Sequence, residues 1–185
     1  RGDRNEMAEA AYELGNVAAS KGNFHLALEH YDEAIKMRPK SVDFLMTRGQ
    51  CRELYGDDIG ALVDYETAVR IEPENINAYF KRGWLRYKQK DYKGAVEDFS
   101  VVIRNESDLG TSAVIFKGVE YNEGGATEMT SVTTIDRLKS DAYNVRALAR
   151  TEMEDYPGAL ADYQSAIALN SEDPNYYVNR GLLSP

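Results

Sequence analysis

The sequence has few of the residues from which disulfide, metal and catalytic sites are built. Its 185 residues include one cysteine, Cys51, two histidines, His25 and His30, and one tryptophan, Trp84. A single cysteine excludes an internal disulfide framework and favours a reducing, intracellular setting, so we expect a cytoplasmic location. The histidines are five residues apart, which places them on different faces of one helix, so they cannot share a metal ion as histidines four residues apart can. We therefore expect no enzyme activity and no metal or other cofactor.

Long apolar runs and an excess of positive charge are also missing. No apolar stretch approaches the roughly 18 residues that a membrane-spanning helix needs. The formal net charge is −9, from 31 acidic and 22 basic residues. Nucleic acid phosphates and anionic membranes are bound mainly through Lys and Arg. We therefore expect neither nucleic acid binding nor direct membrane insertion.

What the sequence does have is a repeated spacing of small and aromatic residues. A small residue is followed by an aromatic residue after four positions and by a second small residue after three more. The first three copies start at Ala27, Ala61 and Ala95, which are 34 residues apart, and the fourth starts 64 residues later. The four sets are Ala27/Tyr31/Ala34, Ala61/Tyr65/Ala68, Ala95/Phe99/Val102 and Ala159/Tyr163/Ala166. Such fixed self-similarity indicates one supersecondary unit stacked on copies of itself.

The residue types within each copy predict a pair of helices. In the second 34-residue repeat, which we number from Val42, Gly49 and Ala61 stand at the eighth and twentieth positions, where small residues let two helices approach closely. Tyr65, at the twenty-fourth position, fills the gap beside that contact, and Pro73 ends the second helix. The four turns contain a residue suited to capping the helix that follows: Asn23, Asp57, Asp91 and Asp155.

With these residues the chain resembles the tetratricopeptide repeat family, whose unit is a helix–turn–helix of 34 residues. The resemblance implies an all-α, right-handed superhelix, or solenoid, of antiparallel helix pairs. It places the repeats at residues 8–41, 42–75, 76–107 and 140–173, with the truncated first helix of a fifth repeat at 174–185. Residues 1–7 are expected to be a disordered tail, and both ends of the sequence are consistent with a piece of a longer protein.

Residues 108–139 interrupt the repeats and do not fit their pattern. We expect a loop rich in Gly, Ser and Thr, followed by an early start, near Thr133, of the first helix of the fourth repeat. The short apolar run Val114-Ile115-Phe116 is typical of a strand but has no obvious partner. Two interpretations remain open: the insertion is an exposed excursion, or this run folds onto the groove as an internal mimic of a ligand.

The resemblance implies a protein-interaction scaffold or adaptor that binds a partner peptide in a concave groove lined by the first helix of each repeat. Carried over position by position, the groove residues are Tyr12, Asn16, Thr47, Gln50, Asn77, Phe80, Lys81, Trp84, Tyr87, Lys88, Asn144 and Leu148. Phe80, Trp84 and Tyr87 form a stripe at helical spacing. Either the stripe anchors a peptide, with lysines pairing a ligand carboxylate, or it packs within the protein.

Two alternative functions are weighed beside groove binding. Self-association through repeat ends would make the chain a structural module and a homo-oligomer, because Leu182 and Leu183 offer apolar surface there. A chaperone-type carboxylate clamp is the less favoured alternative. Of the residues that the clamp pattern requires, only Asn16 matches outright, and Lys81 replaces an arginine with loss of bidentate geometry.

Overall fold

The computed structural model describes residues 2–105, 113–122 and 125–183, with the side chains of residues 2–105 and 135–183. Contacts between Cα atoms divide the chain into two compact units, which we describe separately. The first unit comprises residues 1–78 and 115–131, and the second comprises residues 79–114 and 132–185.

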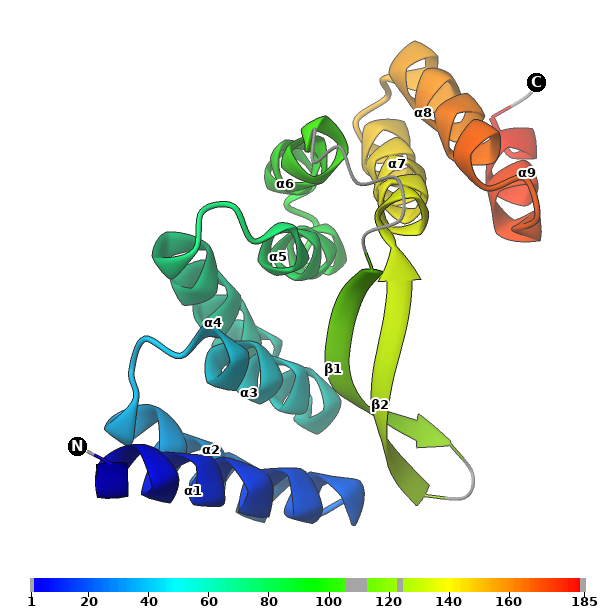
Figure 1. Cartoon of the computed structure of the whole chain (residues 1–185). Coiled ribbons are helices and arrows are strands. Elements are labelled where there is room, and N and C mark those ends of the chain that lie inside the picture. The colour runs from blue at the N-terminus through cyan, green and yellow to red at the C-terminus, as the bar shows by residue number, and fades with distance from the viewer. Residues whose placement is uncertain (1, 106–112, 123–124, 184–185) are drawn as a thin grey trace. The chain divides into compact units, whose positions relative to one another are not determined.

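The helices of the first unit form two pairs (Figure 1). Helices α1 (Gly2–Ser20) and α2 (Phe24–Met37) make the first pair, and α3 (Val42–Tyr55) and α4 (Asp58–Ile71) make the second. The two helices of each pair are joined by a short turn and pack against each other, and α2 also packs against α3. This arrangement is the stacked helix–turn–helix that the sequence repeat predicts.

The second unit continues the same pattern (Figure 1). Helix α5 (Ile76–Lys88) precedes α6 (Tyr92–Arg104), and α7 (Ile135–Glu152) pairs with α8 (Tyr156–Leu169). Helix α6 packs against α7, and α8 packs against the last helix, α9 (Pro174–Gly181). The repeats of this chain therefore have an all-α helical fold, as predicted.

The N-terminal residues do not form the disordered tail expected for residues 1–7. Helix α1 begins at Gly2, so residues 2–7 are helical, and residue 1 lies outside the described residues. No proline interrupts this stretch, and Asp3 in the first turn complements the positive end of the helix dipole. The helix therefore extends toward the N-terminus beyond the first residue of the repeat.

The insertion differs from the predicted loop. Strands β1 (Ala113–Asn122) and β2 (Gly125–Thr134) form a two-stranded sheet, antiparallel because only two residues join them (Figure 1). Both strands are rich in the β-branched residues that favour strands. Helix α7 begins at Ile135, two residues after the predicted start. The side chains of Val114, Ile115 and Phe116 lie outside the described residues, so both interpretations, an exposed excursion and a run folded onto the groove, stay predictions.

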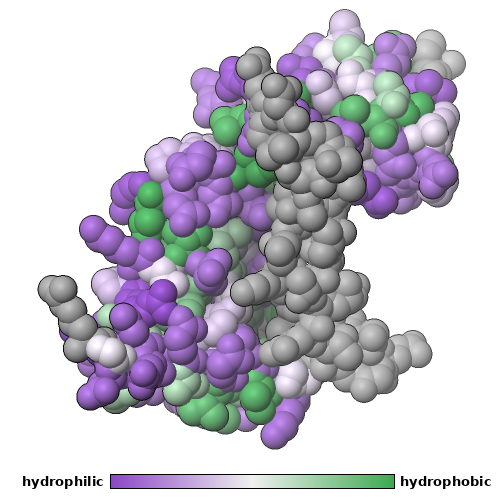
Figure 2. All heavy atoms as spheres, viewed as in Figure 1, coloured by the Kyte–Doolittle hydropathy of each residue, from purple (hydrophilic) through white to green (hydrophobic). Residues whose placement is uncertain are grey.

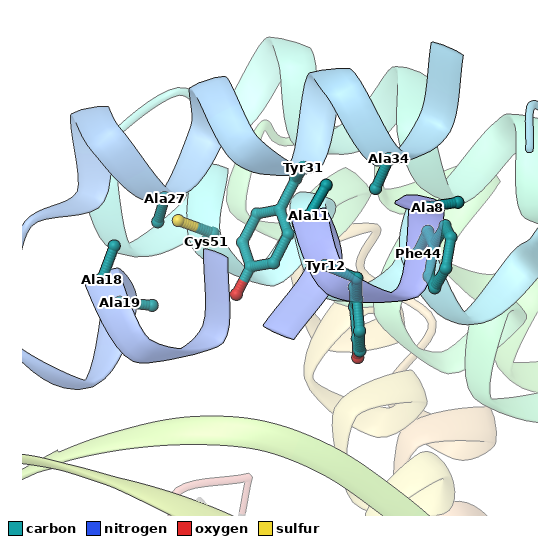
Figure 3. Close-up of a cluster of buried hydrophobic side chains, with 10 residues drawn as sticks. All are labelled: Ala8, Ala11, Tyr12, Ala18, Ala19, Ala27, Tyr31, Ala34, Phe44 and Cys51. Atoms are coloured by element: carbon teal, nitrogen blue, oxygen red, sulfur yellow. The ribbon is translucent and has the colours of Figure 1, made fainter. Parts of the chain in front are cut away.

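Each helix pair is held together by a fully buried aromatic ring. Tyr31 is enclosed by the alanines of α1 and α2 (Figure 3), and Tyr65 is likewise buried between α3 and α4. A Cβ atom added to Gly15 would lie 2.5 Å from the ring of Tyr31, and one added to Gly49 would lie 2.6 Å from the ring of Tyr65. In these two repeats the tyrosine ring therefore fits only because the eighth residue is glycine.

The turns between paired helices share one backbone conformation. The last residue of each turn caps the next helix, as predicted: side-chain oxygens of Asn23, Asp57, Asp91 and Asp155 accept from backbone N–H groups at 3.2, 2.9, 3.0 and 3.1 Å. The preceding residue has a positive φ in every case. It is Gly22 or Gly56 in the first unit, but Lys90 (φ 65°) or Glu154 (φ 62°) in the second.

Three repeats also contain a buried aspartate held by two arginines. The carboxylate of Asp98 in α6 accepts hydrogen bonds from Nε and Nη2 of Arg82, at 2.9 and 2.7 Å, and from Nη1 of Arg86 at 3.1 Å. Asp64 and Asp162 receive the same bonds from the arginines at equivalent positions, namely Arg48 with Arg52 and Arg146 with Arg150. These bidentate pairs join the two helices of a repeat at a fixed register.

Replacing Gly49 with alanine should destabilise the second repeat by about 1–3 kcal/mol, because the added methyl group overlaps the ring of Tyr65. This ring is fully buried, and its hydroxyl donates to Glu53, so it has little room to move. Gly181 is the matched control, since it stands at the same repeat position with nothing within 4 Å of an added Cβ. Urea unfolding should separate the two variants, and equal midpoints would contradict this account.

Replacing Asp98 with asparagine should lower the free energy of unfolding by about 2–3 kcal/mol, because two arginines lose their shared carboxylate. We expect a value below that of a fully buried pair, since both arginines keep some exposure. Glu97→Gln, which neutralises the exposed neighbouring carboxylate, should change stability by less than about 0.5 kcal/mol. A similar loss in both variants would show that general charge, rather than this network, is responsible.

Candidate functional site

In the first unit, three predicted groove residues form hydrogen bonds within the protein. The Tyr12 hydroxyl and the Thr47 Oγ1 lie 2.9 Å apart, and these residues are only 8% and 7% exposed. The ring of Tyr12 also stacks on Phe44, with centroids 4.6 Å apart. Asn16 accepts a hydrogen bond of 2.8 Å from the hydroxyl of Tyr31. These groups are engaged in joining the helices, and the single outright match to the carboxylate clamp, Asn16, is among them.

Two other predicted residues of this unit carry a buried oxygen without a hydrogen-bond partner. They are Gln50 (Oε1) and Asn77 (Oδ1), the two such side-chain atoms among the described residues. Gln50 lines a small pocket together with Tyr31, Thr47, Cys51 and Leu54. A buried acceptor left unpaired costs about 1–3 kcal/mol. Each of these amides therefore has hydrogen-bonding capacity that the helices themselves do not use.

In the second unit, the three residues of the predicted aromatic stripe make different contacts. Phe80 is half-buried and packs edge-on against the buried Phe99, with ring centroids 5.4 Å apart. Trp84 is 36% exposed and stacks on the half-buried Tyr87 at 5.9 Å with an angle of 27° between the rings. Phe80 therefore packs against the core of its helix pair, whereas Trp84 and Tyr87 pack on each other and Trp84 is exposed.

A third ring, which the sequence analysis did not include, extends this surface. Tyr92, the first residue of α6, lies with its ring centroid 5.8 Å from that of Tyr87. Trp84, Tyr87 and Tyr92 are hereafter called the aromatic surface. Tyr92 follows the turn rather than lying on a first helix, so a search confined to first-helix positions misses it. The sequence does contain one signal for it, since a tyrosine, Tyr156, also follows the equivalent turn of the next repeat.

A carboxylate from the next helix pair lies beside the aromatic surface. Glu152, the last residue of α7, has its Oε2 3.5 Å from the hydroxyl of Tyr92. Burial, and then the negative charge of Glu152, raise the pKa of Tyr87 above its ordinary value. The tyrosine hydroxyls therefore stay protonated near neutral pH, and Glu152 contributes the negative charge at this place.

The remaining predicted residues of the second unit have mixed roles. Asn144 accepts a 3.0 Å hydrogen bond from Nδ2 of Asn179, and Leu148 packs against the cluster of Ala147, Ala159 and Tyr163. Lys81 is half-buried and Lys88 is exposed, and each interacts with another group of the chain. Of the predicted residues in this unit, Trp84 and Tyr87 thus combine exposure with a large contact area.

The residue types that ligate metals are not gathered at one place in the described part of the chain. No group of three or more His, Cys, Asp or Glu side chains is placed to hold a metal ion there. Burial raises the pKa of the Cys51 thiol to about 11, which leaves it protonated and a poor nucleophile. The described helices also include none that is long and apolar enough to cross a membrane.

Comparison with known families identifies the repeat in three parts of the chain. Models described as tetratricopeptide repeat match residues 8–41 and 77–108, and a model described as TPR repeat matches residues 147–183. A search of curated proteins gave no sequence match.

Solved structures of the same fold cover nearly the whole chain. A MamA fragment from Desulfovibrio magneticus RS-1 is 17% identical, with a TM-score of 0.73 over 96% of this chain and 83% of that one. PilF of Pseudomonas aeruginosa is 17% identical, with a TM-score of 0.69 over 98% and 69%. YrrB, described as a TPR protein with an unusual peptide-binding site, is 16% identical, with a TM-score of 0.66 over 94% and 74%. From its matched repeats and its fold together, the chain is a tetratricopeptide repeat protein.

Proposed function

We propose that this chain is a protein-interaction module that binds a peptide segment of a partner protein at the aromatic surface of the second unit. The observation that carries the proposal is the exposure of Trp84, which stacks on Tyr87 yet remains 36% accessible to solvent. Tetratricopeptide repeat proteins are generally interaction modules, and aromatic side chains are frequent hot spots of interfaces.

The character of the remaining surface supports this choice of site. Hydrophilic residues cover most of the helical surface visible in Figure 2, and hydrophobic residues form separate patches among them. Isolated exposed apolar residues are normal and need no partner. Three neighbouring rings are a different feature, because they offer one contiguous area of rigid side chains whose burial costs little conformational entropy.

Self-association is a second candidate, and it depends on different residues. Of the two leucines expected there, Leu182 is 79% exposed, whereas Leu183 packs against a buried cluster of the second unit; Val178 of α9 is 60% exposed. An apolar edge of this kind can bind a second copy of a repeat protein. Sedimentation over a range of concentrations distinguishes the two functions, since a chain that stays monomeric at high concentration does not assemble through this edge.

Replacing Trp84 with alanine should abolish partner capture and leave helicity unchanged. Loss of a central aromatic hot spot costs about 2 kcal/mol or more, which corresponds to roughly 30-fold in affinity. The measurement compares the proteins captured by the wild type and by the variant, with circular dichroism of both. Tyr55→Ala is the matched control, because Tyr55 is an exposed aromatic residue at the end of α3, outside the aromatic surface.

Two results would contradict the proposal. If Trp84→Ala unfolds the protein, Trp84 is a core residue and its exposure has no functional meaning. If the folded variant captures the same partners as the wild type, the partner binds elsewhere on the chain. Trp84→Phe, which keeps a ring at this position, should retain most of the binding.

A further inference from the structure

The aromatic surface has a chemical character that specifies its ligand beyond "a peptide", an inference that rests on the proposed function. Three rings and one carboxylate meet at the ends of three successive helices, and all four belong to the second unit. Trp84 and Tyr87 come from α5, Tyr92 from the start of α6, and Glu152 from the end of α7.

The three rings of the aromatic surface differ in orientation. Trp84 and Tyr87 are nearly parallel at 27°, whereas Tyr92 is tilted by 55° from Tyr87. The face of an aromatic ring is the negative part of its quadrupole, and it attracts a cation within about 6 Å of the ring centre, most strongly for tryptophan. Apolar side chains also bind such rings, so the rings alone do not determine the charge of the ligand.

The carboxylate of Glu152 favours a positively charged ligand. Its carboxylate lies 3.5 Å from the Tyr92 hydroxyl, and its side chain is exposed at the edge of the rings. Its charge reaches Tyr87 as well, since it is among the causes that raise the pKa of that phenol. The whole chain carries a net charge of −9, which favours the approach of a positively charged segment.

Three charged residues near the rings in sequence already interact with other groups of the chain. Asp91, in the turn before Tyr92, lies 3.8 Å from Nε of Arg86. Lys81 and Lys88 are on the same helix as Trp84, three residues before it and four residues after it, and each interacts with another group of the chain. These lysines are the reason to consider an acidic ligand as the competing outcome.

We propose that the aromatic surface binds a cationic side chain, arginine or lysine, of the partner peptide. The charged group lies over the face of Trp84 or Tyr87, and the carboxylate of Glu152 pairs with it from the edge. Arginine suits this arrangement better, because its planar guanidinium group stacks on a ring while its N–H groups point outward to a carboxylate.

The sole tryptophan of the chain provides the measurement, because its fluorescence reports directly on this surface. The probes are three blocked tetrapeptides that differ in one residue, which is arginine, glutamine or glutamate, titrated into the full chain. We expect the arginine peptide to bind most tightly and the glutamate peptide least. Binding of the arginine peptide should weaken as salt is added.

Glu152→Gln separates the charge from the rings. It should weaken the arginine peptide about fivefold and leave the glutamine peptide unchanged, because it removes one ion pair and no ring. Glu172→Gln is the control, since it removes an equal charge from an exposed residue outside the aromatic surface and should leave both affinities unchanged.

Three results would overturn the inference, and they differ in what they mean for the proposed function. Tighter binding of the glutamate peptide, reduced by Lys81→Gln, would show an acidic ligand while the peptide site itself stands. Equal weakening by Glu152→Gln and Glu172→Gln would reduce the role of Glu152 to overall charge. Failure of the arginine peptide to bind at about 10 mM would reject the cationic ligand. The proposed function fails as well only if Trp84→Ala also leaves partner capture intact.

Discussion

The contact between a buried aromatic ring and the small residue facing it sets the geometry of every complete repeat. Tyr31, Tyr65, Phe99 and Tyr163 are almost fully buried, and each packs against the eighth residue of its repeat. The eighth residue, glycine in three repeats and Ala147 in the fourth, leaves room for the ring. Because this contact fixes the two helices of a pair, it also fixes which face of the first helix is left for other contacts. The aromatic surface of the second unit is one such face.

The helix pairs, their turns and their capping residues could be predicted because they depend on residues close together in the sequence. The arginine–aspartate network shows the limit of that reasoning. Its residues recur with the same period of 34, from Arg48 to Arg82 and from Asp64 to Asp98, so the signal was present. Charged residues are usually read as solvated surface, however, and nothing in the sequence alone shows that these aspartates are buried. The strands of the insertion are a similar case, because β1 and β2 are strands only by pairing with each other, and the sequence showed no obvious partner for the apolar run.

The candidate site was less predictable, because the same repeat position has different roles in different repeats. The fifth position bonds to the sixth position of the next repeat in Tyr12–Thr47 and in Asn144–Asn179, whereas in the third repeat it is Phe80, which packs against Phe99. Family positions alone mark these residues as groove-lining, whereas the structure shows that their polar groups join neighbouring repeats. Such bonds connect residues 35 positions apart, and whether they form depends on side-chain directions that the sequence does not give.

Some repeat positions make the structural contacts and others do not, which explains how one fold can take different ligands. Positions eight and twenty-four hold the pair together, and positions five and six join successive repeats. Trp84, Tyr87 and Tyr92 stand at positions nine, twelve and seventeen, and Glu152 at position thirteen of the following repeat, so none belongs to these structural contacts. Residues free of a structural role can change without loss of the fold. In the proposed function, ligand recognition therefore depends on residues at the turn of one repeat and at the end of the next first helix, rather than on the whole face.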